Sequence, residues 1–149
     1  MASLEEVMKE KISADHLLYV SLKYTKTCDV ILNLLKRWEI MMERSIEYLL
    51  EVLKKKKKIK VIPKAPKMRI DIVKDFFKKD EQIMKAVELF EMFKKLDILE
   101  KTREHEFRKG VCLRIKYLGK EVPVNLETLK EYAEILERFI SYVKQFLLS

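Results

Sequence analysis

The sequence predicts a mainly α-helical protein: a four- or five-helix up-and-down bundle with a small β-hairpin before the last helix. Three observations lead to this fold class. Residues 27–58 carry apolar side chains at steps of three and four, the period of an α-helix, without a Gly or Pro. The 149-residue chain has only two Gly and three Pro with 38% charged and 48% hydrophobic residues, a composition that favours helices. Residues 111–116 change to the two-residue period of a strand.

The longest predicted element is one helix from Thr27 to Lys58. Thr27 can cap its first turn with a hydroxyl, and Lys54–Lys58 end it where the helix dipole favours cations. With a rise of about 1.5 Å per residue the helix is roughly 45 Å long, and it can bury so long a stripe only against other long helices. The stripe is predicted to form the core and contains Ile31, Leu34, Leu35, Trp38, Met41, Met42, Leu49, Val52 and Leu53.

A first and a last helix are predicted to accompany this long one. Ser3 can cap a helix that continues to about Tyr24, and Asn125 can cap the last helix. Only the short polar break at residues 25–27 separates the first helix from the long one. We therefore expect these two helices to be antiparallel neighbours.

The middle of the chain is predicted to contain a stiff connector and one or two shorter helices. Pro63 and Pro66 form the connector, because their rings cannot continue a helix. Apolar side chains then recur with helical spacing over residues 68–78 and 81–97, with Asp80 able to cap the second stretch. The pattern leaves open whether the two stretches are one bent helix or two helices.

The segment before the last helix is predicted to form the hairpin. Residues 100–109 are almost entirely polar and are interpreted as a helix tail or a loop. The alternating pattern that follows, with a turn at Gly119, predicts a hairpin over about residues 110–124. Pro123 restricts the returning strand to an edge of the sheet.

Residues 1–149 are predicted to form one domain, of which the hairpin is an insert. The chain lacks a stretch that resembles a signal peptide or a membrane span, so we expect a cytoplasmic protein. Abundant Lys and Glu with few Asn and Gln are typical of hyperthermophiles. Cys28 and Cys112 are expected to be reduced and packed, and a disulfide between them is the alternative, since hyperthermophile cytoplasm tolerates disulfides.

The sequence predicts no catalytic residue, no metal site and no cofactor. The two histidines, His16 and His105, and the two cysteines are too scattered for the paired short spacings of a structural zinc site. The chain contains no glycine-rich phosphate-binding motif and no nucleophile motif. The remaining catalytic alternative pairs Cys112 with His105, should the loop before the strand fold back onto it.

The strongest functional signal is a concentration of positive charge. Residues 54–79 contain twelve basic and two acidic residues, whereas the rest of the chain, whose net charge is +8 overall, is close to neutral. Such a patch could follow nucleic-acid phosphates, although no aromatic residue lies between positions 54 and 69 to stack on bases. The alternative is a helix end that only increases solubility. The candidate nucleic-acid-binding residues are Lys54, Lys55, Lys56, Lys57, Lys58, Lys60, Lys64, Lys67 and Arg69.

Two short runs resemble a family of known proteins. The runs ADHLLYV, at 14–20, and EFRKGVCLRI, at 106–115, followed by a capped last helix, resemble a group of small archaeal helical proteins similar in layout to the HEPN superfamily. The resemblance implies a helical bundle, often dimeric, that binds or cuts RNA through an Arg-x(4–6)-His motif. Here Arg103 lies only two residues before His105, and His16 has no Arg before it, so the ribonuclease residues are not present.

Two functions follow as expectations. The first is a non-catalytic helical binding or assembly module, whose partner is a second copy or another protein held by the helix faces. The alternative is a HEPN-like RNA- or nucleic-acid-binding protein that uses residues 54–69 without the ribonuclease motif. A membrane surface is not expected as a partner, because the lysines cluster at a helix end instead of lining a polar face opposite Trp and Phe.

Overall fold

The structure, a computed structural model, describes residues 3–148 of the chain and their side chains as far as residue 146. It confirms that the protein is mainly α-helical, with one small antiparallel sheet. In chain order the elements are α1 (Leu4–His16), η1 (Leu17–Ser21), α2 (Leu22–Tyr24), α3 (Cys28–Lys55), α4 (Pro66–Phe76), α5 (Glu81–Lys94), β1 (Lys101–Glu104), β2 (Cys112–Tyr117), β3 (Lys120–Asn125) and α6 (Leu126–Leu148).

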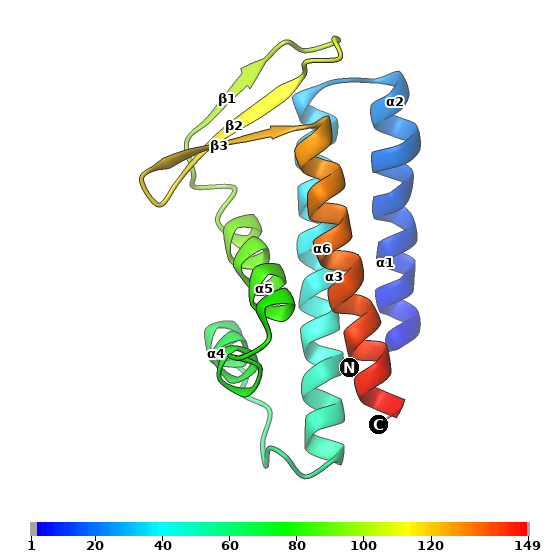
Figure 1. The fold of residues 1–149 in the computed structure, drawn as a ribbon, viewed down its shortest axis with the longest axis vertical. Coiled ribbons are helices and arrows are strands. Elements are labelled where there is room, and N and C mark those ends of the chain that lie inside the picture. The colour runs from blue at the N-terminus through cyan, green and yellow to red at the C-terminus, as the bar shows by residue number, and fades with distance from the viewer. Residues whose placement is uncertain (1–2, 149) are drawn as a thin grey trace.

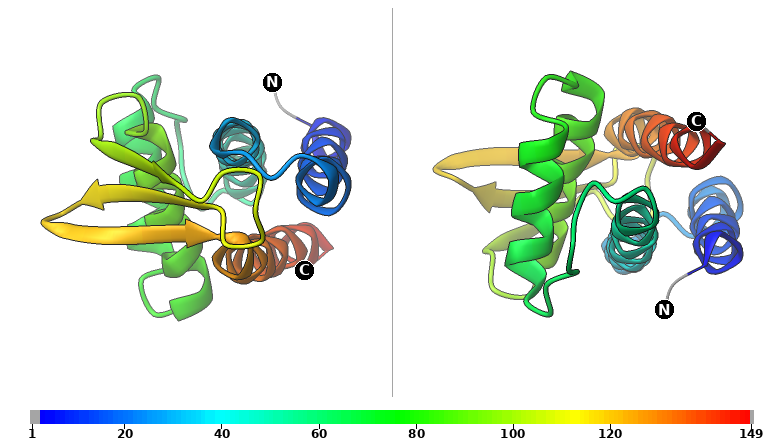
Figure 2. Two further views of the ribbon diagram at one scale, coloured as in Figure 1. Left: turned by 90° about the horizontal axis from the view of Figure 1, so that it is seen from above. Right: turned by 90° about the horizontal axis from the view of Figure 1, so that it is seen from below.

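Helix α3 lies at the centre of the molecule. Helices α1, α3 and α6 run side by side along the long axis, and α4 and α5 cover the side of α3 that faces away from α1 (Figures 1 and 2). The predicted stripe is buried throughout its length, and its Trp38 ring stacks on Phe93 of α5 with 6.1 Å between the ring centroids. The stripe is therefore the core around which the other helices pack.

Helix α3 ends earlier than the sequence predicts. It stops at Lys55 instead of Lys58, because Lys57 takes the left-handed conformation, with φ of 61°. The Lys58 N–H then donates to the Leu53 carbonyl (2.9 Å) and the Lys57 N–H to the Lys54 carbonyl (3.0 Å), the hydrogen-bond pattern of a Schellman C-cap. The last lysines of the run therefore lie in a turn and a connector.

Replacing Lys57 by glycine is expected to raise the free energy of unfolding by about 0.5–1 kcal/mol. A side chain with a Cβ is strained at positive φ, and glycine removes that strain although it loses more backbone entropy on folding. Urea denaturation followed by circular dichroism measures the change. Lys55→Gly, at the last residue of α3 and two positions before Lys57, is the control and should destabilise by about 1 kcal/mol. A loss of stability in both variants would contradict the strain argument.

The segment after the connector forms two helices, α4 and α5, which answers the question that the pattern left open. Helix α4 begins at Pro66 and ends at Phe76. Proline is tolerated there, because the backbone N–H groups of the first turn have no partner within the helix. The Asp80 carboxylate then accepts hydrogen bonds from the backbone N–H groups of Gln82 and Ile83 (3.0 and 3.2 Å) and starts α5. The chain thus turns sharply between the two helices.

The sheet has three strands in the order β1-β2-β3, which differs from the predicted two-stranded hairpin. The additional strand is β1, formed by residues 101–104, interpreted from the sequence as a helix tail or loop. It pairs with β2 from Lys101↔Ile115 to Glu104↔Cys112. The two strands are also joined by the ion pair between Glu104 and Arg114. The sheet projects from the helices at one end of the molecule, and β3 leads directly into α6 (Figure 1).

The first helix differs from a regular α-helix in one place. Residues 17–21 form η1, a π-helical turn, between α1 and α2. Such wide turns are rare, and they often lie at functional sites. Here the turn lies at the same end of the molecule as the sheet (Figure 1).

Candidate nucleic-acid interface

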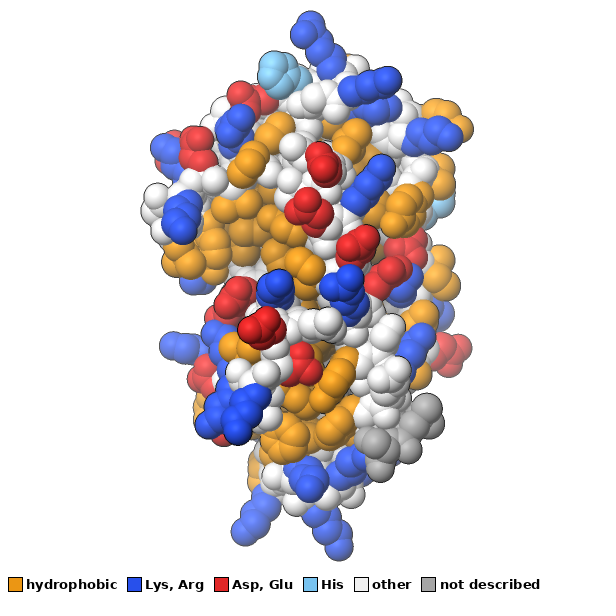
Figure 3. Space-filling model, viewed as in Figure 1, with side chains coloured by type: hydrophobic (Ala, Val, Ile, Leu, Met, Phe, Trp, Pro, Cys, Tyr) orange, Lys and Arg blue, Asp and Glu red, His pale blue; other side chains and the backbone are white. Residues whose placement is uncertain are grey.

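The predicted lysines lie together at the end of the molecule opposite the sheet. They follow the C-terminus of α3 and the connector to α4, and Figure 3 shows Lys and Arg side chains projecting from this lower end. All of them are exposed except Lys56, which is half-buried. Among the described residues, no ion pair involves Lys54, Lys55, Lys57, Lys58, Lys60, Lys64 or Lys67.

Several cations elsewhere on the molecule have carboxylate partners. Lys36 Nζ lies 2.8 Å from Asp97 Oδ1, and Arg44 Nη1 lies 3.0 Å from Glu6 Oε2. The lysine end therefore keeps a positive field that the fold does not neutralise, which is the requirement for attracting a polyanion.

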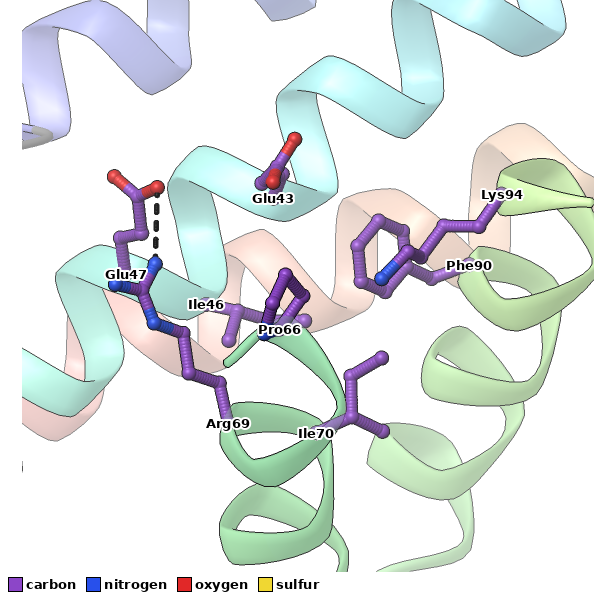
Figure 4. A pocket seen from close by; sticks show the side chains of 8 residues that line it. All are labelled: Glu43, Ile46, Glu47, Pro66, Arg69, Ile70, Phe90 and Lys94. Atoms are coloured by element: carbon purple, nitrogen blue, oxygen red, sulfur yellow. Dashed lines mark hydrogen bonds and ion pairs between the residues drawn. The ribbon is translucent and has the colours of Figure 1, made fainter. Parts of the chain in front are cut away.

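Arg69 is separated from these lysines by the fold. Its Nε donates to the Pro63 carbonyl (2.6 Å), and its Nη1 lies 3.4 Å from Glu47 Oε1 (Figure 4). With Ile46, Pro66, Ile70 and Phe90 it fills the seam between α3, α4 and α5, which leaves a cavity of only about 10 Å³. Arg69 thus fastens the connector to α3, and its charge is directed at Glu47.

Replacing Arg69 by methionine is expected to lower the free energy of unfolding by about 1–2 kcal/mol. The change leaves the Pro63 carbonyl without its donor and the half-buried Glu47 carboxylate without its partner. Chemical denaturation measures the loss, and Lys67→Met, an exposed position on the same segment, is the control that should change stability by less than about 0.5 kcal/mol. Equal stability of the two variants would mean that Arg69 does not anchor the connector.

An aromatic cluster borders the lysine end. Phe76 and Phe77 at the end of α4 meet Tyr142 and Phe146 of α6, with ring centroids 5.0 to 6.5 Å apart. Phe76 is 40% exposed. Lys56 Nζ lies 5.0 Å from the centre of the Phe146 ring, a cation–π contact that connects the lysine run to the cluster. The aromatic side chains that positions 54–69 lack are therefore supplied by two other helices.

An open hollow lies beside this cluster. Its volume is about 740 Å³, and its lining includes Phe76, Phe77 and Tyr142 together with Lys78 and Lys79 from the turn between α4 and α5. Figure 3 shows hydrophobic side chains among Lys and Arg side chains on the lower half of this face. The sequence signal that could have indicated the hollow is the run Phe-Phe-Lys-Lys at 76–79, which combines both kinds of side chain.

The structure gives little support to the catalytic alternative, in which Cys112 pairs with His105. Both residues line one hollow, as the folded-back loop required, but burial raises the pKa of the Cys112 thiol. Burial also raises the pKa of the Cys28 thiol, whose Sγ donates to the Cys112 carbonyl (3.4 Å). Both cysteines are free thiols, and a thiol with a raised pKa is a poor nucleophile at neutral pH.

No family model, no curated protein and no solved structure matches the chain. Over residues 3–148, no group of three or more Cys, His, Asp and Glu side chains could hold a metal ion. Within the same residues, no helix has the length and apolar character needed to cross a membrane. The lysine end and its aromatic cluster are therefore the candidate site.

Proposed function

We propose that this protein is a non-catalytic binding module for single-stranded nucleic acid, RNA in particular, that uses the lysine end and the aromatic cluster as one surface. The observation that carries the proposal is the position of Lys56 Nζ, 5.0 Å from the centre of the Phe146 ring. Through Lys56, the seven neighbouring lysines that form no ion pair among the described residues become continuous with partly exposed rings. An up-and-down helical bundle is the scaffold, and the HEPN-like layout suggested by residues 14–20 and 106–115 agrees with an RNA ligand.

Each part of the surface has its own role in binding. The lysines neutralise phosphates and release condensed counterions, which supplies affinity for any sequence. Phe76 offers a face on which an unpaired base can stack, and such stacking contributes about 1–3 kcal/mol per base. Bases in a duplex are already stacked and paired, so the aromatic cluster favours a single strand.

Fluorescence anisotropy with a labelled single-stranded RNA of about 12 nucleotides, and with the duplex of the same sequence, tests the proposal. We expect the single strand to bind more tightly, and Phe76→Leu to weaken its binding by about fivefold or more. Phe107→Leu is the matched control, because Phe107 is an exposed phenylalanine in the loop between β1 and β2, at the sheet end of the molecule. Equal binding of strand and duplex, or an unchanged affinity of the Phe76 variant, would remove the role of the cluster.

A second candidate, an assembly module that forms a homodimer through a helix face, is favoured by exposed apolar side chains on the first helix. Ile12 is 67% exposed, and Tyr19, seven residues later on the same face, is 54% exposed. Light scattering coupled to size-exclusion chromatography tests this role. Ile12→Lys should convert a dimer to a monomer, whereas a wild-type monomer at high protein concentration would exclude self-association through this face.

A further inference from the structure

The sheet end of the molecule contains a groove that the lysine end does not explain. It consists of two adjoining hollows that share Leu126 and Lys130 at the start of α6. The first, of about 240 Å³, lies between the first helix and α6, and the second, of about 550 Å³, lies between the sheet and α6. Together they are comparable in size with small-molecule sites, which are typically about 300–1,000 Å³.

The first hollow has an apolar wall. Leu18, Leu22 and Leu126 line it, with Tyr19 beside them. Leu18 and Tyr19 belong to the π-helical turn η1, and Leu22 directly follows it. The π-helical turn therefore contributes side chains to the wall of the groove. Such turns often lie at functional sites.

The groove is also cationic. Lys23, Lys26 and Lys130 line the first hollow, and Lys109 and Lys130 line the second. Arg114, in the second hollow, forms an ion pair with Glu104, so these two charges cancel locally. The four lysines then face one further carboxylate, Glu127. In the part of the chain that the structure describes, none of the four forms an ion pair.

Two loops that line or flank the groove are fastened to each other. The Phe107 N–H donates to the Lys26 carbonyl (2.6 Å), and the Cys28 N–H donates to Glu106 Oε1 (3.0 Å). Arg103 Nη2 lies 2.7 Å from Asp29 Oδ1. These contacts hold the backbones that carry Lys26 and Lys109 in a fixed relation before any ligand arrives, and such preorganisation lowers the entropy lost on binding.

We propose that this groove binds a nucleotide: a phosphate monoester carried on a planar base. The lysines receive the phosphate, and the wall formed by Leu18, Leu22, Leu126 and Tyr19 receives the base. The four lysines, less the charge of Glu127, carry a net charge of about +3, which is more than enough to neutralise the double negative charge of a terminal phosphate, and the apolar wall distinguishes a nucleotide from inorganic phosphate. The phosphate comes from a free mononucleotide or from the 5′ end of a strand. The site lies at the opposite end of the molecule from the lysine end and does not depend on the function proposed there.

Isothermal titration calorimetry on the full-length protein tests the site with five probes: adenosine monophosphate, adenosine, inorganic phosphate, and one short oligonucleotide in two forms, with a 5′-phosphate and with a 5′-hydroxyl group. We expect the monophosphate to bind more tightly than adenosine or inorganic phosphate. Lys26→Gln with Lys130→Gln should weaken this binding by about tenfold or more. Lys54→Gln with Lys55→Gln, at the opposite end, should leave it unchanged, so failure of the groove and failure of the lysine end are distinguishable.

The outcomes separate the two sources of the phosphate. Binding of the monophosphate supports a free nucleotide. A strand end is supported if the monophosphate does not bind but the 5′-phosphorylated oligonucleotide binds more tightly than the 5′-hydroxyl form. This tighter binding should also be lost when Lys26 and Lys130 are changed. Equal affinity for inorganic phosphate and the monophosphate would overturn the role of the apolar wall and with it the nucleotide. Absence of binding by every phosphorylated probe would overturn the site.

Discussion

Replacing Trp38 by alanine is expected to lower the free energy of unfolding by about 3–5 kcal/mol. The side chain lies on α3, is 3% exposed and stacks on Phe93 of α5. Phe93 in turn contacts Tyr132 of α6, with 6.2 Å between the ring centroids. One ring therefore supports the packing of three helices. Its removal leaves a cavity that the surrounding helices cannot readily close. The free energy of unfolding of a domain is typically only about 5–15 kcal/mol, so the variant should lose a large part of its stability.

Urea denaturation followed by circular dichroism measures this loss, because Trp38 is the only tryptophan of the chain and its fluorescence is absent from the variant. Tyr24→Ala is the control, since Tyr24 is an aromatic residue that is 78% exposed. We expect the control to change stability by less than about 0.5 kcal/mol. A loss below about 1 kcal/mol in the Trp38 variant would show that the centre of the helical core lies elsewhere.

The features that the sequence predicted well are those determined by neighbouring residues. Each of the four predicted helix caps is confirmed by a hydrogen bond from a backbone N–H: Ser3 Oγ accepts from Glu6, Thr27 Oγ1 from Val30, Asp80 Oδ1 from Gln82 and Ile83, and Asn125 Oδ1 from Thr128. Caps and helical periods involve residues three or four positions apart, so a single sequence contains the whole signal. The same reasoning explains why all nine residues predicted for the stripe of α3 are buried, although the prediction left out Ile46 and Leu50, which are buried as well.

The third strand was not predictable in this way. Residues 101–104 carry no alternating apolar pattern, and they form a strand only because β2 offers backbone partners and Arg114 offers a charge for Glu104. Strand pairing of this kind depends on segments that the rest of the fold brings together. The polar composition that suggests a loop is, for an edge strand, a normal means of keeping the edge soluble.

The positive charge of the candidate interface was predictable from the sequence, but its aromatic side chains were not. The density of lysines at 54–58 is a property of the sequence, and so is their location at a helix end. The aromatic cluster is not, because Phe76 and Phe146 are 70 positions apart and meet only when α4 packs on α6. Arg69 carries the same charge as the lysines, yet the position of Glu47 on α3 determines that its guanidinium turns inward. Which side chains of one charge stay exposed and which become structural is therefore decided only by the three-dimensional fold.

Neutralising Lys54, Lys55 and Lys58 together by glutamine is expected to weaken binding of single-stranded RNA by about a hundredfold near 0.1 M salt. Each lost phosphate contact removes about 0.7 from the slope of log K against log salt concentration, so the slope should fall by about 2. The wild-type protein, if it neutralises about five phosphates, should lose about two decades of affinity between roughly 50 and 200 mM salt. Lys56 and Lys57 are kept, since Lys56 contacts the Phe146 ring and Lys57 has a left-handed backbone.

Lys9, Lys85 and Lys120, three exposed lysines on other parts of the surface, form the matched control when they are changed to glutamine. The two triple variants have the same net charge, so any difference between them reports the position of the charges and not their number. We expect the control to keep the wild-type slope, because phosphates in contact release counterions and distant charges are screened within about 10 Å at 0.1 M salt. Equal losses in both variants would mean that RNA responds to the overall charge alone. A slope near zero in the wild type would mean that phosphates are not bound at all, and the lysine end would then serve only to keep the helix terminus in water.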